Sequence, residues 1–466
     1  MTANHIDMTK REGLLKNLII FIAPIMLTGI LQLLYTASDL IICGTFSPDK
    51  ESSTAAISAT NSLINLIVNS FLGLAVGANV LMARCFGAED KEKGQRVVYT
   101  SMALSIVIGL FTGVFGALCS RYFIVWMGTP ASIIDLSTSY LAIYFIGVPF
   151  TVIYNFGASL LRAIGDTRKP FYFLTLSGLA NVALNLLFVM VFNMGVEGVA
   201  ICTAISQFLA AGMVVGYLLI MKDGFFHFKI KKIRFYKTET LEIIRIGLPA
   251  AVQGMIFSLS NVIIQSSINS LGKEVVGGNG AAASLEGFVY TAMNSCAQGA
   301  VTFASANYGA KNKPNIRRVI IYCTLLSFGM WFVLSGIILL ARTQLLGLYV
   351  NSEVEIEAGL TRLIIVLSSY FLCGFMDTFA YSLRAIGYSV LPTVISLIGA
   401  CGFRIIWMFC IFPIDYFHNI EWIAISYPIS WALTAATHLT FFLVLYKKLK
   451  FDQSSPEPDQ STAEGA

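Results

Sequence analysis

The stretch that decides the fold is GANVLMARCFGAEDKEKGQRV at residues 77–97, which recurs 222 positions later as GAVTFASANYGAKNKPNIRRV at residues 299–319. Both copies leave an apolar run through Gly-Ala and enter a charged segment, which is typical of a helix that ends in a sharp turn at a membrane surface. A second pair, LRAIG at 161–165 and at 383–387, has the same offset. Two separate motifs with one offset indicate that the chain contains two copies of one unit.

The composition places this unit in a membrane. Of the 466 residues, 56% are hydrophobic and only 12% are charged, whereas a soluble globular protein carries about 25% charged residues. So few charges cannot cover a soluble surface, and the composition excludes soluble, nucleic-acid-binding and secreted disulfide-rich proteins. The nine cysteines stand singly, without metal-ligand or disulfide spacing, and we interpret them as small apolar packing residues.

Twelve apolar runs are long enough to cross a bilayer as helices. They lie at residues 18–44, 54–83, 97–120, 136–161, 171–192, 198–221, 243–270, 281–307, 319–341, 359–383, 391–413 and 422–446. We therefore predict an all-α integral membrane protein of twelve transmembrane helices, folded as two pseudo-symmetric six-helix lobes in a parallel, inverted-V arrangement. Repeats of this kind place a substrate between their halves and alternate its access.

The predicted boundaries follow from this count. Residues 1–221 form the N-lobe, 222–242 a cytoplasmic linker, 243–450 the C-lobe, and 451–466 a disordered tail rich in Ser, Pro and acids. The linker carries several Lys and Arg residues among aromatic ones. Such a segment either serves as a solvated orientation signal or binds anionic lipid headgroups.

The positive residues orient the chain. With both termini in the cytoplasm, all but six of the 31 Lys and Arg residues fall on the cytoplasmic side, the exceptions being Lys50, Arg121, Lys273, Arg342, Arg362 and Arg404. The positive-inside rule therefore predicts a multi-pass protein of the cytoplasmic membrane with both termini inside. Arg162 and Arg384 lie where spans end, and we expect their guanidinium groups to reach water or lipid phosphate.

These features together resemble the multidrug and toxic compound extrusion (MATE) family of secondary transporters, over about residues 15–446. The resemblance is carried by Pro24, Tyr35, Asp39 and Gly44 in the first span, by both repeated motifs, by Asp166, Thr167 and Pro170, by Asn181 and Asn185, and by residues 198–203. It implies two lobes that face a central cleft. It also implies export of amphipathic, often cationic compounds in exchange for protons or sodium.

Ionisable residues inside spans are rare, and each is a candidate for function. At about 1.5 Å per residue, Asp39, Asn185 and Thr203 all fall in the outer half of the first lobe, and Asn181 lies one helical turn before Asn185. One carboxylate, two amides and a hydroxyl form either an oxygen-rich site for Na⁺ or the surroundings of a carboxylate that binds a proton. The resemblance implies a cation site at the same four positions, although some family members have an acid where this chain has Asn185.

The second lobe offers further candidates for ion coupling or substrate binding, namely Glu286, Asp377 and Arg404. Arg404 either pairs with Asp377 or caps helix carbonyls, and Arg362 is set aside because it lies near a span end. His438 either relays protons or packs as a satisfied histidine. The candidates for cavity lining are Gln32, Tyr35, Asn155, Tyr290, Asn294 and Gln298.

The sequence thus favours an ion-coupled antiporter that acts as a monomer in the lipid bilayer on small amphipathic molecules, with no cofactor beyond H⁺ or Na⁺. A flippase for a lipid-linked saccharide or other lipid is the alternative, although twelve spans and the carboxylate of the first span argue against it. An enzyme is not expected, because the four histidines form no metal-binding or nucleophile array.

Overall fold

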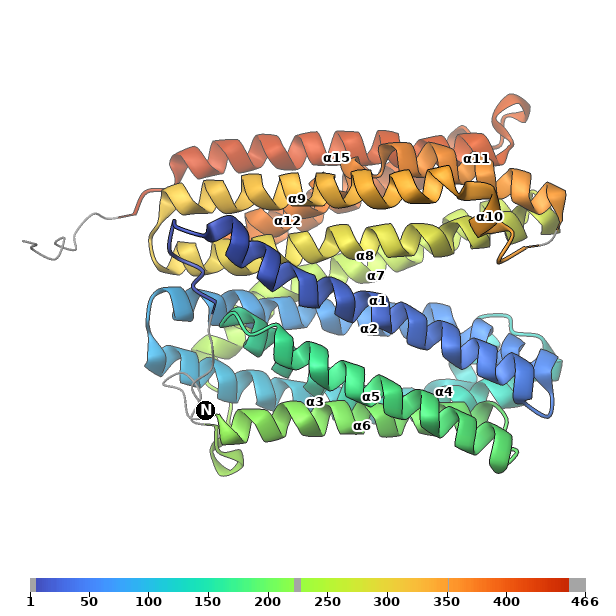
Figure 1. The fold of residues 1–466 in the computed structure, drawn as a ribbon, viewed down its shortest axis with the longest axis horizontal. Helices are drawn as coiled ribbons and strands as arrows, with labels where there is room; N and C mark the ends of the chain where they lie inside the picture. The colour runs from blue at the N-terminus through green and yellow to red at the C-terminus, as the bar shows by residue number, and fades with distance from the viewer. Residues whose placement is uncertain (1–5, 222–227, 351, 452–466) are drawn as a thin grey trace, which may run out of the picture.

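The computed structural model describes residues 6–221, 228–350 and 352–451. Within these ranges the secondary structure is helical throughout, and the helices run side by side in two bundles (Figure 1). The N-lobe contains α1 (Leu14–Phe46), α2 (Lys50–Gly87), α3 (Lys91–Trp126), η1 (Ala131–Ile133), α4 (Ile134–Ala163), α5 (Arg168–Leu186), η2 (Leu187–Val191) and α6 (Val196–Ile220).

The C-lobe follows the segment that contains η3 (Ile230–Lys232). It is built from α7 (Lys237–Asn269), α8 (Lys273–Gly309), α9 (Lys313–Leu340), α10 (Arg342–Leu346), α11 (Glu353–Ser369), α12 (Phe371–Ala385), α13 (Val390–Ser396), η4 (Leu397–Gly402), α14 (Phe403–Cys410), η5 (Asp415–Phe417) and α15 (Ile420–Lys448). Helix α7 begins six residues before the end of the predicted linker. All but the first residue of the predicted tail lies outside the described residues.

The predicted spans match the helices of the described chain. Ten helical segments are long and apolar enough to cross a membrane, and α11 with α12 makes an eleventh span that is bent by 47°. The remaining predicted span corresponds to α8, whose 37 residues include many Gly, Ala, Ser and Asn residues that lower its hydropathy. Large apolar side chains such as Leu118 and Leu340 are more than 70% exposed, as expected for helix faces that contact lipid.

The repeated sequence at 77–97 and 299–319 encodes the same local structure twice. The turn after α2 and the turn after α8 each contain a residue with positive φ, at Glu89 (54°) and Lys311 (56°). The next residue caps the following helix: Asp90 accepts a hydrogen bond from Lys93 N, and Asn312 accepts one from Asn315 N. These side-chain caps satisfy the first amides of α3 and α9 and fix where each helix starts.

The second motif ends α4 and α12 in the same way. Gly165 and Gly387 have φ of 90° and 106°, a conformation that costs a residue with a Cβ atom 1–2 kcal/mol. Their amides donate to the carbonyls of Arg162 and Arg384, three residues earlier. The two glycines therefore stop the helices at equivalent places in the two lobes.

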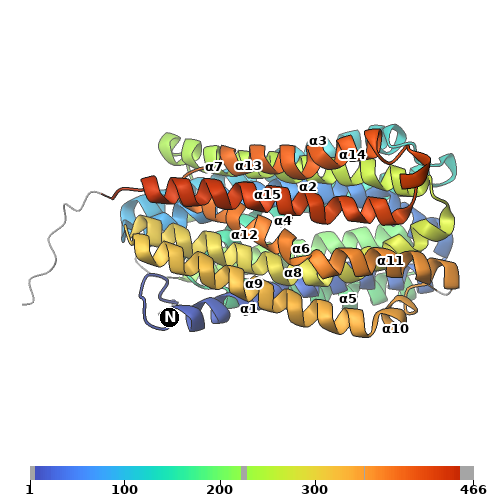
Figure 2. The same cartoon turned by 90° about the horizontal axis from the view of Figure 1, so that it is seen from above.

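Helices α2 and α8 meet at the end of the molecule where the termini lie (Figures 1 and 2), which we call the inner end after the predicted orientation. A Cβ atom on Gly87 would lie 1.8 Å from the Ala306 carbonyl oxygen, and one on Gly309 would lie 2.1 Å from that of Arg84. The two glycines are related by the repeat. Their lack of a side chain allows the backbones of the two lobes to come into contact at this end.

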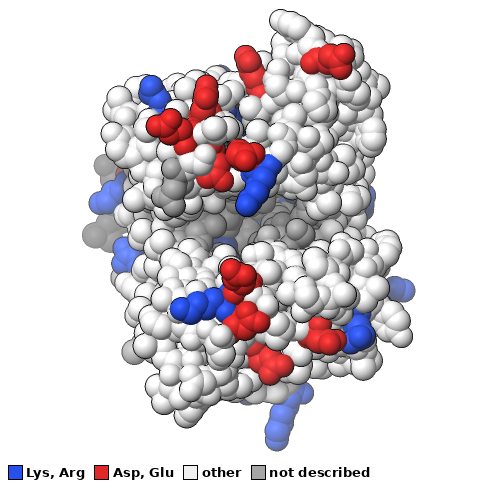
Figure 3. Space-filling view, turned by 90° about the vertical axis from the view of Figure 1, so that its right-hand side faces the viewer, with Lys and Arg blue, Asp and Glu red and all other residues white. Residues whose placement is uncertain are grey.

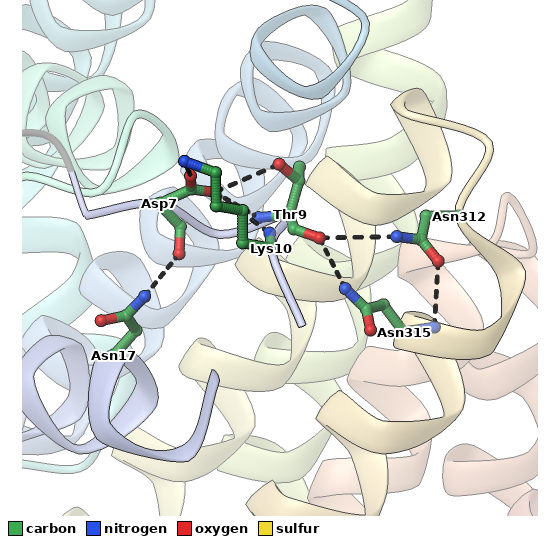
Figure 4. Close-up of polar contacts among 6 residues, drawn as sticks. All are labelled: Asp7, Thr9, Lys10, Asn17, Asn312 and Asn315. Atoms are coloured by element: carbon green, nitrogen blue, oxygen red, sulfur yellow. Dashed lines mark hydrogen bonds and ion pairs between the residues drawn. The ribbon is translucent and has the colours of Figure 1, made fainter. Parts of the chain in front are cut away.

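The N-terminal segment strengthens the contact at the inner end. Met8 is fully buried in the cluster that joins α1, α8 and α9. Its carbonyl accepts a hydrogen bond from Asn307 Nδ2 at 2.8 Å, and the Thr9 carbonyl accepts bonds from Asn315 at 2.6 Å and from Asn312 at 3.4 Å (Figure 4). The segment thereby closes over the inner ends of the C-lobe helices.

Asp7 folds this segment into a turn. Its carboxylate accepts hydrogen bonds from the amides of Thr9 and Lys10 and lies 3.0 Å from Lys10 Nζ (Figure 4). Burial acts to raise the pKa of the Asp7 carboxyl, but the bonds from Lys10 and Thr9 outweigh it and lower the pKa. The side chain therefore stays ionised as a local anchor at neutral pH.

Two ion pairs connect the lobes at the inner end. Lys93 Nζ lies 3.0 Å from Glu242, and Arg96 Nε lies 3.1 Å from Glu239, which is 4% exposed. Both pairs join the start of α3 to the start of α7. At the opposite end a hollow lies between the two lobes (Figure 3). The structure is therefore closed at the inner end and open at the outer end.

Candidate functional site

The predicted N-lobe cluster is assembled by three helices. Asp39 is on α1, Asn181 and Asn185 are on α5, and Thr203 is on α6. Asn185 Nδ2 donates to Asp39 Oδ1 at 2.6 Å and to Asn181 Oδ1 at 3.2 Å. The two asparagines are buried, one helical turn apart on a single face of α5.

Thr203 lies on α6, the third helix of the cluster. Its hydroxyl donates to the Val199 carbonyl at 3.0 Å, as a threonine in a helix commonly does. The α-helical part of α5 ends one residue after Asn185, and the π-helical turn η2 follows. Such turns interrupt regular backbone bonding and are frequent at functional sites.

Asn185 has one acceptor that no donor satisfies. Its amide nitrogen serves both Asp39 and Asn181, while its buried Oδ1 has no hydrogen-bond partner in the described protein. An unpaired buried amide oxygen is costly, and a bound cation or water molecule would satisfy it. One carboxylate with neutral oxygens suits a monovalent ion, and among the described residues no group of three His, Cys, Asp or Glu side chains could hold a metal.

A chain of hydrogen bonds crosses from the N-lobe to the predicted C-lobe acid. Arg162 Nη1, on α4, donates to Gln298 Oε1 at 2.7 Å. Gln298 Nε2 donates to Asn294 Oδ1 at 3.0 Å, and Asn294 Nδ2 donates to Asp377 Oδ2 at 3.3 Å. Every donor points the same way, from the guanidinium to the carboxylate. The chain thus connects a contact between the lobes to Asp377.

A small cavity of about 30 Å³ lies beside the start of this chain. Its walls come from both lobes and include Asn79, Arg162, Gln298 and Thr302. Thr302 donates to Asn79 Oδ1 at 3.0 Å across the lobe boundary. The volume is enough for a water molecule and far too small for a drug-sized ligand, so the lobes are closed to substrate at this level.

The expectation that Arg162 and Arg384 reach water or lipid phosphate is wrong for Arg384, whereas Arg162 is only partly buried. Arg162 turns inward to Gln298. Arg384 is 2% exposed and donates from Nη2 to Gln253 Oε1 at 2.6 Å. Arg84 on α2 also joins the two lobes, because its Nη2 donates to the carbonyls of the last two residues of α12.

Glu286 lies in an ion pair with a residue that the sequence analysis set aside. Arg362 is 6% exposed and donates from Nε and Nη2 to the two Glu286 carboxylate oxygens, at 2.8 and 2.7 Å. Its Nη1 donates to Asn279 at 2.8 Å. The sequence contained an indication of this partner, because Arg362 is one of the few positive residues predicted on the outer side of the membrane.

Arg404 does not form an ion pair with Asp377 in the described chain. Its Nε donates to the Ser430 hydroxyl at 2.9 Å, and its guanidinium lies over the rings of Tyr427 and Trp431, at 4.1 and 5.3 Å from their centroids. The π-helical turn η4 directly precedes the helix that carries it. Aromatic faces therefore stabilise this buried cation.

His438 has the surroundings of a packing residue. It is fully buried, and its two ring nitrogens lie 3.2 Å from the carbonyls of Met376 and Pro392. A neutral imidazole carries one N–H and donates to one of these carbonyls, while the Ser396 hydroxyl lies 3.5 Å from Nε2. The histidine thus connects α15 to α12 and α13.

The remaining predicted lining residues differ in environment. Gln32 is exposed on α1, and Tyr290 is 40% exposed on α8, with its hydroxyl 3.4 Å from Asn294. Tyr35 donates to the Thr175 carbonyl on α5, and Asn155 is buried and donates to the Thr151 carbonyl. Asn155 is therefore engaged within its own helix.

Comparison with known proteins finds a match in each of the two lobes. A family model described as MatE matches residues 24–187 and 249–410, one segment in each lobe. The chain is 25% identical over 449 residues to a probable multidrug resistance protein of Bacillus subtilis, covering 93% of this chain and 94% of that one. It is 24% identical over 395 residues to a multidrug export protein of Staphylococcus aureus, covering 84% and 85%.

Solved structures share the fold. One is an outward-facing multidrug resistance transporter, which aligns with a TM-score of 0.87 at 20% identity over 96% of this chain and 99% of that one. Another is a transporter of the MOP superfamily from Pyrococcus furiosus, with a TM-score of 0.88 at 20% identity and the same coverage. At this identity the likeness concerns the arrangement of helices.

Proposed function

The chain belongs to the MatE family of multidrug and toxic compound extrusion transporters, and from this premise we propose that it is a cation-coupled antiporter. It exports amphipathic organic compounds, cationic ones included, by alternating access between its two lobes. The observation that carries the proposal is the Asp39 cluster: a carboxylate on α1 whose hydrogen-bond partner is the neutral side chain of Asn185.

Asp39 is the coupling group in this mechanism. A lone carboxylate with uncharged neighbours gains a full countercharge when a proton or Na⁺ binds, so occupancy changes the local net charge from negative to neutral. Movement of α1 against α5 would alter the Asn185 bond to Asp39 and so change affinity for the cation. A cation taken up from the open outer side would then favour release of the exported compound.

The charge distribution supports this direction. The outer ends of the helices and their connections carry Asp49, Glu51, Asp135, Glu197, Glu274, Glu353, Glu355, Glu357, Asp415 and Glu421, and acidic side chains surround the hollow in Figure 3. Such a field concentrates cations near the outer opening. The basic inner end supports placement of both termini in the cytoplasm. We further propose that the chain acts as a monomer in the plasma membrane and needs no cofactor.

The flippase alternative gains no support from the relatives described above, which are called multidrug resistance and export proteins. An enzymatic role is likewise not proposed, because the family consists of transporters. The second-lobe acid Asp377 is a further coupling candidate, since it also accepts its hydrogen bond from a neutral asparagine, Asn294.

The test uses Asp39→Asn in proteoliposomes, with gradient-driven efflux of a fluorescent organic cation as the measurement. We expect efflux at the level of protein-free liposomes. Asp135→Asn is the matched control, because it makes the same change at an exposed outer residue, and it should transport normally. Normal exchange by Asp39→Asn, in protein that elutes as a folded monomer, would refute the coupling role.

Separate gradients identify the ion. Efflux that follows a pH gradient and ignores a sodium gradient would rule out a Na⁺ site at Asp39, Asn181, Asn185 and Thr203. If a sodium gradient drives efflux, Asn185→Leu should raise the sodium concentration needed for half-maximal transport about tenfold or more, because it removes the unpaired Oδ1.

A further inference from the structure

The segment between the lobes forms a basic cavity against α3. The cavity has a volume of about 410 Å³ and is lined by Lys231, Lys232 and Arg234 together with Gln95, Tyr99 and Tyr236. Its lining contains no carboxylate. Among the described residues, no acid lies within ion-pair distance of these three cations, in contrast to Lys93 and Arg96 nearby, which are paired.

The cavity is held in place at both ends of the basic run. Before it, the Phe228 ring stacks on Tyr99 of α3, with 5.8 Å between centroids. After it, Tyr236 N donates to Thr100 Oγ1 at 3.4 Å, and the Arg234 guanidinium lies over the Tyr236 ring. The backbone that carries the three exposed cations is thus held against α3, and all three line one space.

The depth of this cavity matches the lipid headgroup layer. Tyr99 lies about 12 Å along α3 from its inner end at Lys91. Ile230 and Phe235 flank the cations and are 58% and 50% exposed. Apolar side chains exposed next to cations are typical of a segment at a membrane interface. A soluble phosphate would use the cations and leave these two side chains in water.

We propose that this cavity binds the phosphate headgroup of an anionic lipid of the inner leaflet. The three cations would contact the phosphate, while Ile230 and Phe235 would contact the acyl boundary. Because the cavity exists only while the linker lies on α3, and because the linker continues into α7, the bound headgroup also favours the state in which the inner end is closed.

The test is a titration of the full-length protein in detergent with phosphatidylglycerol, with bound lipid counted by native mass spectrometry. Phosphatidylcholine and inorganic phosphate are separate arms. The variant is Lys231→Gln/Lys232→Gln/Arg234→Gln. The matched control is Lys447→Gln/Lys448→Gln/Lys450→Gln, which removes three exposed lysines from the same side of the membrane.

Wild type and control should retain one phosphatidylglycerol molecule, and the linker variant should bind it about 100-fold more weakly, since three cations at about 1 kcal/mol each contribute about 3 kcal/mol. An equal loss of phosphatidylglycerol binding in the linker variant and the control would overturn the site. It would mean that the lipid is attracted by the general positive charge of this side of the protein. Inorganic phosphate that displaces the lipid at similar concentration would overturn the lipid as occupant.

Hydrogen exchange provides the conformational readout. In wild type and control, phosphatidylglycerol should slow amide exchange in the first turns of α3 and α7 relative to phosphatidylcholine, and it should not do so in the linker variant. Unchanged exchange despite retained lipid would overturn the link to inner closure. Similar unfolding temperatures of all three proteins in phosphatidylcholine would show that the substitutions leave the fold intact.

Discussion

Glu286 and Asp377 are both acids of the C-lobe, yet their partners differ in charge. Glu286 has a bidentate guanidinium from Arg362, which already neutralises it. Asp377 accepts from the neutral amide of Asn294, much as Asp39 accepts from Asn185. An acid without a fixed countercharge can gain and lose a cation. At the residue scale, therefore, Asp39 and Asp377 fit coupling and Glu286 fits structural pairing.

Removing Arg362 should test the structural role of Glu286. Arg362→Met leaves a buried carboxylate unpaired and should lower the free energy of unfolding by about 3–5 kcal/mol, whereas Glu286→Gln/Arg362→Met should recover most of the loss. Denaturant titration in detergent provides the measurement. Arg342→Met, at an exposed outer arginine, should change stability little. If the Arg362→Met protein is stable but fails to transport, the ion pair between Glu286 and Arg362 serves transport rather than stability.

Interrupting the chain that ends at Asp377 should test whether its members act together. Gln298→Leu removes the side chain that connects Arg162 to Asn294, and we expect it to reduce efflux in the same sense as Asp377→Asn. The double variant should be no worse than the more severe single variant, because residues that act as a unit are not additive. Efflux rates of the two single variants and the double variant test this prediction. If the fractional losses of the single variants multiply in the double variant, Gln298 and Asp377 act independently.

The sequence predicted how deep the candidate residues lie in the helix bundle better than it predicted their partners. Position along a span was enough to choose Asp39, Asn181, Asn185 and Thr203, because helical geometry fixes depth and face. Arg362 was misplaced because distance from a span end does not reveal that its guanidinium points toward α8. Partners on different helices depend on the rotation of each helix, which hydropathy does not determine.

At the element scale, the two copies of the repeat explain why the helices end where they do. Glu89 and Lys311 have equivalent backbone angles, and so do Gly165 and Gly387. Hydropathy predicted the ends of the helices to within eight residues, the largest difference being at the start of α8. It did not predict the bend of 47° between α11 and α12, because no proline or glycine marks Tyr370 and the direction of α12 is set by packing on α8 and α15.

Glycine at the crossing of α2 and α8 should be required for inner closure. Gly309→Ala would bring a Cβ atom to 2.1 Å from the Arg84 carbonyl oxygen, and such overpacking typically costs about 1–3 kcal/mol. Gly329→Ala in α9 is the matched control, since nothing lies within 4 Å of its added Cβ atom, and it should be neutral or slightly stabilising. Thermal unfolding in detergent measures both, and equal shifts would contradict a tight crossing.

At the scale of the whole molecule, contacts are concentrated at one end. The glycine crossing, the N-terminal segment and two ion pairs hold the lobes together inside, while the outer ends leave a hollow (Figure 3). Alternating access requires these inner contacts to break as outer ones form. Hydrogen bonds and ion pairs suit this use better than a fully apolar interface, because water can replace their partners when the inner end opens.

The ion pair between Arg96 and Glu239 should therefore control the balance between the two states. Arg96→Glu places two acids together and should weaken inner closure by about 1–3 kcal/mol, so amide exchange at the starts of α3 and α7 should become faster. The swap Arg96→Glu/Glu239→Arg should restore slow exchange, because it reverses the pair without removing it. Arg121→Glu, which alters an exposed outer pair, should leave exchange at the inner end unchanged. A swap that exchanges as fast as the single variant would show that burial of Glu239, rather than its charge partner, keeps the inner end closed.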